Sequence, residues 1–420
     1  MREMKPSSME WVGDIPASWK VMPNKYLMYK KKEICPVYNG EDILSLTMKG
    51  VIVRDLDAGG KMPTSFDGYQ RLEPGNLLMC LFDIDVTPRC IGLIKQTGLS
   101  SPAYSQFVLC DNANAAYYCY YYTMLDNDKT LLHLAKNLRH SLTEDQLGAI
   151  PVIVPPIDEQ QRIADFLDTK CAEIDALTAD IQTQIDTLEQ YKRSVITETV
   201  TKGLNPNAEM RNSGIQWIGN MPSSWSVLKG KYMFAQRSLR GNSIELQLLS
   251  PTQKFGVIPQ TRYEELSGMN AVKLSEKADL SLLKTIHKGD FCISLRSFQG
   301  GFEYSEYEGV VSPAYQVFYP TVEIADGYYR YLFKEQGFIE KMNSYTMTLR
   351  DGKNIAFSDF GNTYIPYPPL TEQSEIAAYL NSKCAQINAL ITEKQQQLAT
   401  LNEYKKSLIF EYVTGKKEVV

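Results

Sequence analysis

The chain is poor in the residues that carry most enzyme chemistry. Only three histidines occur among 420 residues, His133, His140 and His287, and none lies near another in the sequence. Eight cysteines are spread singly without a CxxC pair, so we expect no metal site and predict reduced, buried thiols in a cytoplasmic protein. No apolar run approaches the ~18 residues that a membrane span needs. The first ten residues also have no apolar core, so we expect neither a membrane helix nor a secretory signal.

Sequence motifs for catalysis and cofactor binding are also missing. The chain contains no GxxxxGK[ST] loop, no GxGxxG after a strand, and no HExxH, GxSxG or kinase signature. Its two "PP" motifs, "VPPI" and "YPPL", lack the Asn or Asp and the trailing aromatic residue of an adenine-methyltransferase motif. These absences favour a recognition protein over an enzyme.

Net charge gives little guidance about partners. The formal net charge is −5, and the segment 151–214 accounts for it, with 6 Lys+Arg against 11 Asp+Glu. The remaining segments are close to neutral and can still present a basic face, so the charge neither requires nor excludes DNA as a partner.

The sequence is an internal repeat. "MEWVGDIPASWK" from Met9 and "IQWIGNMPSSWS" from Ile215 hold all four tryptophans. "SPAYSQF" from Ser101 matches "SPAYQVF" from Ser312, and "VPPIDEQQRIADFL" from Val154 matches "YPPLTEQSEIAAYL" from Tyr367. Because these landmarks keep their order, we expect two copies of one architecture.

Each copy has a globular part followed by a helix. The globular part mixes short alternating runs such as "GNLLMCLFDI" and "GDFCISLRSF" with helical stretches such as "GYYRYLFKEQGFIEKM", which predicts a mixed α/β domain. The fold class is therefore α+β, with two tandem domains and two long helices. The predicted boundaries are 1–154 for the first domain, 155–203 for the first helix, 204–214 for a linker, 215–366 for the second domain and 367–420 for the second helix.

Both helical segments carry a heptad pattern. Alternating spacings of four and three residues persist for over four heptads, with polar breaks at matching places, Lys170 with Lys383 and Gln184 with Gln397. The apolar residues that we predict to form the helix–helix seam are Ile163, Leu167, Ile174, Leu177, Ile181 and Leu188 in the first helix and Ile376, Leu380, Ile387, Leu390, Leu401 and Leu408 in the second.

A helix from about Glu159 to Thr201 would extend for roughly 65 Å at 1.5 Å per residue. It is too long to fold back on its own domain, so we expect its apolar seam to pack on the helix of the other copy. A pseudo-two-fold relation between the copies would make the two helices an antiparallel coiled coil. In that arrangement Cys171 and Cys384 lie far apart, and we expect no disulfide between them.

With the repeat established, the chain resembles the specificity (S) subunit of type I restriction–modification enzymes. The resemblance depends on "WIG.MP.SW", "GVVSPAYQVFYP", the "PP..EQ..IA.YL" start of each helix, and helix ends such as "LEQYKRSVITETVTKG". It implies two target recognition domains, each reading one half of a split DNA sequence, and spacer helices that set the gap between the halves. Because the two domains differ between the landmarks, we expect an asymmetric target.

The resemblance also implies partners and a non-catalytic role. It predicts double-stranded DNA, two methyltransferase (M) subunits that dock on the helices, and restriction (R) subunits. S-adenosylmethionine, ATP and Mg would then belong to the partner subunits, with no cofactor or metal in this chain.

Candidate DNA-binding residues are the polar side chains between the landmarks, because shared landmarks are expected to be scaffold. Arg can fork onto guanine and Gln onto adenine, and ordinary surface charge is the alternative for each position. The candidates are Lys30, Lys31, Lys32, Arg54, Lys61, Arg89 and Arg139 in the first domain and Arg237, Arg240, Lys254, Arg262, Arg296, Gln299, Arg350 and Lys353 in the second.

Aromatic motifs have two interpretations. The paired tryptophans could stack on bases, but their identical placement in domains expected to read different sequences favours a structural anchor. "YYCYYY" from Tyr117 is interpreted in the same way, as a buried helix face.

Two other functions remain open: a protein-binding scaffold that holds two copies of a non-nucleic-acid partner, and a self-sufficient methyltransferase or nuclease. The missing motifs disfavour the enzyme.

Overall fold

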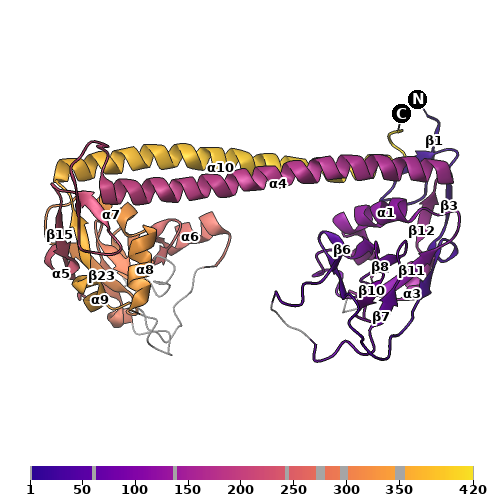
Figure 1. The fold of residues 1–420 in the computed structure, drawn as a ribbon, viewed down its shortest axis with the longest axis horizontal. Helices are drawn as coiled ribbons and strands as arrows, with labels where there is room; N and C mark the ends of the chain where they lie inside the picture. The colour runs from indigo at the N-terminus through magenta and orange to yellow at the C-terminus, as the bar shows by residue number, and fades with distance from the viewer. Residues whose placement is uncertain are drawn as a thin grey trace. The chain divides into compact units, whose positions relative to one another are not determined.

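The computed structural model describes residues 2–58, 63–135, 140–241, 246–270, 280–293, 301–345 and 355–419 (Figure 1). The chain divides into two compact units. Unit 1 consists of Met1–Gln182 with Gln396–Val420, and unit 2 consists of Thr183–Gln395. Each long helix is therefore divided between the units.

Unit 1 is built on a four-stranded antiparallel sheet with the order β4-β11-β8-β9. Four two-stranded ladders accompany it: β1-β2, β12-β3, β10-β7 and β5-β6. The strands are β1 (Met4–Pro6), β2 (Asp14–Pro16), β3 (Lys20–Pro23), β4 (Met28–Lys31), β5 (Leu44–Thr47), β6 (Gly50–Val53), β7 (Gln70–Leu72), β8 (Leu77–Met79), β9 (Ile91–Leu93), β10 (Gly98–Ser100), β11 (Ser105–Leu109) and β12 (Pro151–Val154).

Helix α1 (Ala115–Asn127) lies between the sheet of unit 1 and the first half of α4 (Ile157–Lys202) (Figure 1). Four of its tyrosines, Tyr117, Tyr118, Tyr121 and Tyr122, are fully buried in the core of the unit. The prediction of a buried aromatic helix face is therefore confirmed. The shorter helices of this unit are η1 (Asn24–Tyr26), α2 (Thr130–Leu134) and α3 (Glu144–Ala149).

Unit 2 repeats the strand order of unit 1. Its four-stranded antiparallel sheet has the order β16-β23-β20-β21, with ladders β13-β14, β15-β24, β19-β22 and β17-β18. The strands are β13 (Met210–Asn212), β14 (Asn220–Pro222), β15 (Ser226–Lys229), β16 (Phe234–Gln236), β17 (Leu249–Thr252), β18 (Gly256–Pro259), β19 (Lys284–Ile286), β20 (Phe291–Ile293), β21 (Phe302–Tyr304), β22 (Gly309–Val311), β23 (Gln316–Pro320) and β24 (Tyr364–Tyr367).

The core of unit 2 is a cluster of aromatic rings. Phe234 contacts Phe291 and Phe318 edge to face, with ring centroids 5.9 and 5.5 Å apart, an arrangement that aromatic rings prefer. The helices of this unit are α5 (Gly230–Met233), α6 (Gln260–Ser267), η2 (Leu280–Leu282), α7 (Asp326–Leu332), α8 (Gln336–Ser344) and α9 (Phe357–Asn362). The mixed α/β character predicted for both domains is confirmed.

The two long helices are α4 and α10 (Leu370–Val413), of 46 and 44 residues. The predicted first helix, from about Glu159 to Thr201, is confirmed within two residues at each end. In unit 1 the end of α10 lies beside the first half of α4, where the Lys405 ammonium contacts both carboxylate oxygens of Asp175 at 2.6 and 2.7 Å. In unit 2 the end of α4 lies beside the start of α10, where Lys192 donates to Asn388 at 2.7 Å.

The buried face of each helix differs from the predicted apolar seam at one residue, Leu177 in α4 and Leu390 in α10. Leu177 and Leu390, both predicted on the seam, are each 47% exposed. Their neighbours Thr178 and Ile391 take the inward positions. The remaining predicted seam residues are buried or half-buried: Ile163, Leu167, Ile174, Ile181, Leu188, Ile376, Leu380, Ile387, Leu401 and Leu408.

The physical reason is that the sequence allows two heptad registers that share half their positions. Leu177 and Leu390 occupy the inward position of the register that we predicted, whereas Cys171, Ile185 and Cys384 occupy that of the register observed, where they are buried. Packing against the rest of each unit selects the second register.

All eight cysteines are free thiols, Cys171 and Cys384 included. None of the described helices is both long and apolar enough to cross a membrane.

Candidate nucleic-acid interface

The first tryptophan motif anchors the start of α4 in unit 1. Trp19 is fully buried, and its indole Nε1 donates to Glu159 Oε2 at 2.9 Å in the first turn of the helix. Arg2 pairs with the same carboxylate, and the pKa of Arg2 is raised chiefly by this hydrogen bond. The next residue, the buried Gln160, accepts from the backbone N–H of Asn114 at 2.8 Å. Glu159 and Gln160, the "EQ" at the start of α4, therefore join the helix to the tryptophan and to the rest of the unit.

Unit 2 repeats this arrangement with the second motif. Trp225 is 1% exposed and donates from Nε1 to Glu372 Oε2 at 2.8 Å. Gln373 accepts from the backbone N–H of Ala325 at 2.9 Å. The interpretation as structural anchors is confirmed for Trp19 and Trp225, because buried rings of this kind cannot stack on bases.

Each unit also holds the end of the other long helix. The Tyr117 hydroxyl donates to the carbonyl of Val413 at 2.8 Å in unit 1, and the Tyr328 hydroxyl donates to the carbonyl of Val200 at 2.7 Å in unit 2. Both tyrosines are fully buried.

A glycine follows each helix end where the chain passes the anchoring tryptophan. Gly415 has φ +71°, and a Cβ there would lie 2.8 Å from Trp19. Gly203 has φ +75°, and a Cβ there would lie 3.2 Å from Trp225. Glycine alone fits both the left-handed backbone and the close approach. The tryptophan, the start of one helix and the end of the other thus form a fixed platform in each unit.

In each unit the central pair of strands of the four-stranded sheet ends beside a turn of the same sequence. In unit 1 the pairing of Met79 with Ser105 places the loop after β8 beside the turn Ser101–Tyr104. In unit 2 the equivalent pairing, of Ile293 with Gln316, places the end of β20 beside the first residue after the turn Ser312–Tyr315. These "SPAY" turns are identical in sequence, whereas the segments beside them are not. The two units therefore share a framework of strands and differ in the sequence next to it.

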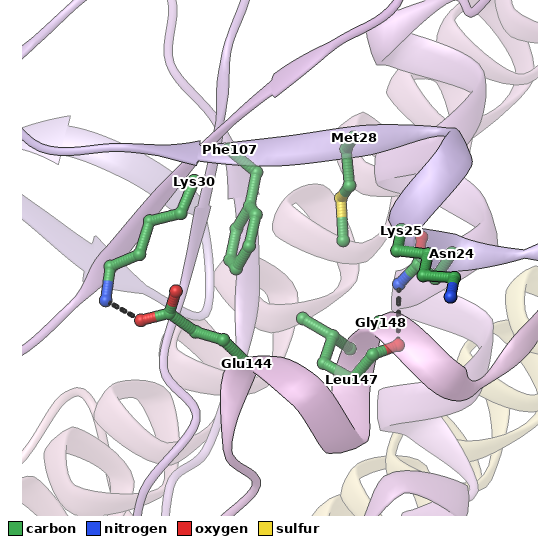
Figure 2. Close-up of a pocket in the computed structure, with 8 residues that line it drawn as sticks. All are labelled: Asn24, Lys25, Met28, Lys30, Phe107, Glu144, Leu147 and Gly148. Atoms are coloured by element: carbon green, nitrogen blue, oxygen red, sulfur yellow. Dashed lines mark hydrogen bonds and ion pairs between the residues drawn. The ribbon is translucent and has the colours of Figure 1, made fainter.

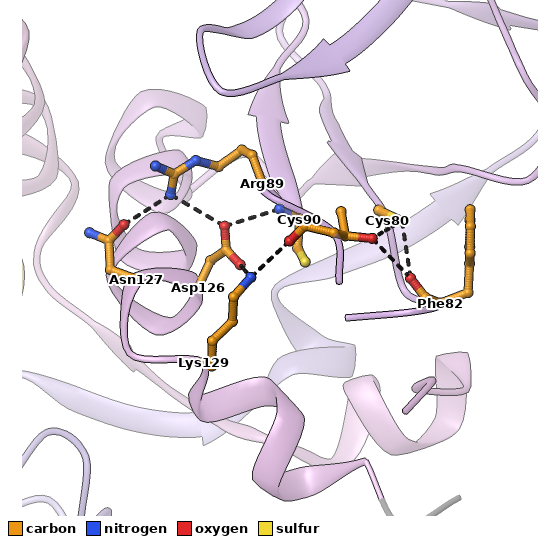
Figure 3. Close-up of polar contacts among 8 residues, drawn as sticks. Cys80, Phe82, Arg89, Cys90, Asp126, Asn127 and Lys129 are labelled. Atoms are coloured by element: carbon orange, nitrogen blue, oxygen red, sulfur yellow. Dashed lines mark hydrogen bonds and ion pairs between the residues drawn. The ribbon is translucent and has the colours of Figure 1, made fainter. Parts of the chain in front are cut away.

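Arg89, a predicted DNA contact in the loop after β8, is held by a buried carboxylate (Figure 3). Asp126 is 3% exposed and receives hydrogen bonds from Arg89 at 3.3 Å, from Lys129 at 3.0 Å and from the backbone N–H of Cys90 at 3.0 Å. Burial raises the pKa of the Cys90 thiol to about 12, so this cysteine is no nucleophile. The geometry gives Arg89 a structural role in shaping the loop.

Lys30 and Lys31 lie on β4 and form ion pairs. Lys30 contacts Glu144, beside a shallow cavity of about 90 Å³ (Figure 2), and Lys31 contacts Glu73. The pKa of Lys31 is raised, chiefly by its hydrogen bond to Glu73. A cavity of this size is smaller than the ~300–1,000 Å³ of typical ligand pockets, so these lysines are surface charges that already have acidic partners.

Arg237 in unit 2 is bound as firmly as Arg89 in unit 1. Its Nε and Nη2 donate to the two oxygens of Asp290 at 2.6 and 2.9 Å, and its guanidinium lies 4.4 Å from the ring centroid of Tyr319. Asp290 is 2% exposed. This bidentate pair holds β16 to the turn before β20, which is a structural role.

The remaining described candidates lie nearer the surface. Lys32, Arg240 and Lys254 are exposed and form no ion pair with a residue that the structure describes. Arg54 is half-buried, and the exposed Arg262 pairs with Glu265 at 2.9 Å within α6. As DNA contacts, all five stay predictions. Six further candidates lie outside the described residues: Lys61, Arg139, Arg296, Gln299, Arg350 and Lys353.

The sequence interpretation missed Lys284, the first residue of β19. Its ammonium donates to the carbonyl of Tyr315 at 2.6 Å, at the end of the second SPAY turn. Matching "KTIHKGD" with "QRLEPGN" aligns Lys284 with Gln70, and this exchange of a neutral residue for a basic one was the available signal.

Catalytic groups are sparse among the described residues. Glu303 is buried, pairs with Lys334 at 2.6 Å, and burial raises its pKa to about 7. Its cross-strand neighbour is Cys292, whose pKa is also raised by burial, so the pair offers no thiolate nucleophile. No group of three or more His, Cys, Asp or Glu side chains in the described part of the chain could hold a metal ion.

Comparison with known proteins points in the same direction as this geometry. The family model of the type I restriction modification DNA specificity domain matches residues 101–187 and 249–400, more than half of the chain. Two proteins of Methanocaldococcus jannaschii are similar, both named as specificity subunits of type I restriction enzymes. MjaX is 24% identical over 291 residues, which cover 66% of this chain and 62% of that protein. MjaVIII is 26% identical over 287 residues, which cover 64% and 63%. The chain thus spans about three fifths of the length of these curated relatives.

Solved structures share the fold. A chain from a study of complex assembly and conformational transition of the type I R-M system has a TM-score of 0.68 at 15% identity, with 96% of this chain and 99% of that chain covered. The HsdS subunit from Thermoanaerobacter tengcongensis has a TM-score of 0.51 at 14% identity, with 98% and 100% covered. The resemblance indicated by the sequence motifs is confirmed: the chain belongs to the family of type I restriction–modification DNA specificity proteins.

Proposed function

We propose that this chain is the non-catalytic DNA-recognition subunit of a type I restriction–modification complex, in which each unit reads one half of an asymmetric, bipartite target. The observation that carries the proposal is that both units have the same strand order but differ in the sequence next to their SPAY turns. Both units have the same strand order and the same SPAY turn, but different residues surround that turn. A shared frame suits contacts common to every target, and divergent residues suit base-specific contacts.

In this proposal α4 and α10 form an antiparallel coiled coil that sets the gap between the half-sites, with a pseudo-two-fold relation between the repeats. Contacts inside each unit support the pairing. Phe166 and Tyr412 have ring centroids 4.4 Å apart in unit 1, and Lys383 lies 5.6 Å from the ring centroid of Tyr191 in unit 2.

The proposal assigns the docking of two methyltransferase subunits to an outer stripe of the helices. Leu177 and Leu390 are each 47% exposed, and Tyr191 and Tyr404 are 48% and 55% exposed. The stripe, defined as positions one residue before the buried seam, has identical residues on both helices: Lys170, Leu177, Gln184 and Tyr191 on α4, and Lys383, Leu390, Gln397 and Tyr404 on α10. Apolar residues kept at matching exposed positions suit two copies of one helical partner.

The chemistry would then reside on the partners. S-adenosylmethionine would be bound by the methyltransferase subunits, and ATP and Mg²⁺ would serve the restriction subunits. Such a complex would act on DNA in the cytoplasm.

The decisive experiment selects DNA from a random duplex library with the chain bound to its methyltransferase partner, followed by methylome mapping of cells that express both. We expect enrichment of one split, asymmetric motif and methylation within it. If no sequence is enriched with methyltransferase subunits present, the chain is a protein-binding scaffold, and the proposal is wrong.

A second experiment tests the spacer. One heptad inserted after Gln182 and one after Gln395 would lengthen both helices at the boundaries of the units in the chain. Seven residues add about 10 Å of helix, or about three base pairs at ~3.4 Å each. The unread gap in the target should grow by about that amount. An unchanged gap would refute the proposal that the helices set the distance between the half-sites.

A third experiment tests docking. Leu177→Glu together with Leu390→Glu should abolish co-purification with the methyltransferase subunit, because both charges lie on the outer stripe. Ala172→Glu with Ala399→Glu adds the same charges at exposed positions on the other flank of the seam, and this control should still bind. Equal binding by both variants would show that the outer stripe does not contact the methyltransferase subunit.

A further inference from the structure

Arg240 and Lys284 lie directly opposite each other on neighbouring segments of unit 2. They form an isolated antiparallel bridge. The backbone N–H groups of the residues that follow them, Gly241 and Thr285, each donate across the bridge at 3.0 Å. Hydrogen bonds that flank a residue pair in this way define a non-hydrogen-bonded pair, in which opposing side chains approach most closely.

Two positive charges at such positions repel each other. Burial lowers the pKa of Lys284, Cys292 raises it in part, and Arg240 lowers it again. Arg240 is exposed and forms no ion pair within the described part of the chain. Lys284 donates one N–H to Tyr315, which leaves two for another acceptor. The pair therefore has positive charge and free donors but no described anion to balance them.

Unit 1 has the same backbone arrangement without the charges. Ile34 and Gln70 form the equivalent antiparallel bridge. Gln70 Nε2 donates to the carbonyls of Ser101 and Tyr104 at 2.9 and 2.7 Å, and so supports the first SPAY turn as Lys284 supports the second. The fold thus needs a donor at this position but not a cation, and the two charges in unit 2 require another explanation.

The carbonyl that accepts from Lys284 belongs to Tyr315, so the pair lies beside the second SPAY turn. The tip of the turn, Pro313 and Ala314, is exposed. A ligand that contacts Lys284 can therefore also contact the turn.

We propose that Arg240 and Lys284 form an anion site that takes a phosphodiester group of the DNA backbone beside the turn Ser312–Tyr315, with no counterpart in unit 1. The site rests on the proposed function for the source of its phosphate, and it adds an asymmetry to that function. Unit 2 gains a sequence-independent backbone contact that unit 1 lacks. Such contacts position a domain on DNA without reading sequence.

The test replaces each cation with the residue that unit 1 has at the same position, in the full-length chain: Arg240→Ile with Lys284→Gln. Without DNA, the double variant should melt at a higher temperature than the wild type, because the repulsion is gone. Inorganic phosphate should raise the melting temperature of the wild type more than that of the variant. Affinity for cognate and non-cognate duplexes should fall by the same factor, and the salt slope of log K should become shallower by about 0.9 per lost phosphate contact. The sequence recognised should not change.

The reverse graft, Ile34→Arg with Gln70→Lys in unit 1, is the matched control and should strengthen binding to every duplex. A lower melting temperature for the unit 2 variant would overturn the proposal, because it would show that the charges are already balanced. Stabilisation by phosphate with unchanged DNA affinity would overturn it in favour of a site for free phosphate. If phosphate stabilises the wild type but not the variant while no split motif is enriched from the library, the anion site stands and the DNA-recognition function fails.

Discussion

The register of the long helices gives the sharpest stability prediction, because adjacent turns of α4 offer an inward and an outward apolar residue. Ile174 is 7% exposed and Leu177 is 47% exposed. Replacing each by alanine removes three carbon atoms from the side chain, so the two variants differ mainly in burial. Ile387 and Leu390, at 3% and 47% exposed, repeat the comparison in unit 2.

The expected costs follow from burial. Removing three buried carbons loses about 2.4 kcal/mol of transfer free energy at ~0.8 kcal/mol each, and the residual cavity brings Ile174→Ala into the range of about 2–5 kcal/mol. Leu177→Ala loses about half of the transfer free energy, and water fills the space. Alanine is also the better helix former, so its cost should be about 1 kcal/mol or less.

Urea unfolding followed by tryptophan fluorescence measures both values, since each unit contains two tryptophans. Ile174→Ala should shift the midpoint substantially and Leu177→Ala only slightly, and the pair in unit 2 should behave in the same way. Equal costs within a pair would show that the leucine is buried, and the observed register would then be wrong.

Three further predictions concern the platform and the buried carboxylate. Trp225→Phe removes the charged hydrogen bond to Glu372 and should lower the free energy of unfolding in urea by about 1.5–3 kcal/mol. A change near zero would show that this hydrogen bond does not anchor the helix. Gly415→Ala should destabilise the chain far more than Gly40→Ala, because both have positive φ but only Gly415 has atoms within 2.6–2.8 Å of the new Cβ; calorimetry measures this difference, and equal shifts would contradict it. The pKa of Glu303 is raised to about 7, so the folded state holds this proton more tightly than the unfolded state, and stability should fall as pH rises from the ordinary value towards 7. Glu303→Gln should remove this loss, on the order of 2–3 kcal/mol, and an unchanged pH profile would refute the assignment.

Features encoded by local pattern were predictable from the sequence. The repeat, the two long helices, the buried aromatic face of α1 and the anchoring role of Trp19 and Trp225 all follow from periodicity or from motifs that recur in order. A helix signal is contained within a few turns of the chain, and an internal repeat compares the sequence with itself. Neither depends on knowing which distant segments meet.

The candidate DNA-binding residues show where this approach stops. Arg89 and Arg237 resemble surface arginines in the sequence, but each is held by a buried aspartate, Asp126 and Asp290, that lies 37 and 53 residues away. No local pattern identifies such a partner, because the contact forms only when segments remote in the sequence pack together.

The sequence by itself determined that the chain is an internal repeat and that each copy is a mixed domain followed by a long helix. It also determined that the chain resembles DNA specificity proteins. The repeat and the helices follow from hydrophobic periodicity and repeated motifs, which act over short stretches, and the family follows from the resemblance of those motifs to known specificity subunits. Only the tertiary structure decided which face of each helix is buried, which arginines are tied to buried carboxylates, and that Arg240 opposes Lys284. Those outcomes depend on packing and on the register between segments remote in sequence. The two heptad registers of each helix, for example, fit the local sequence almost equally well, and only the tertiary contacts select between them.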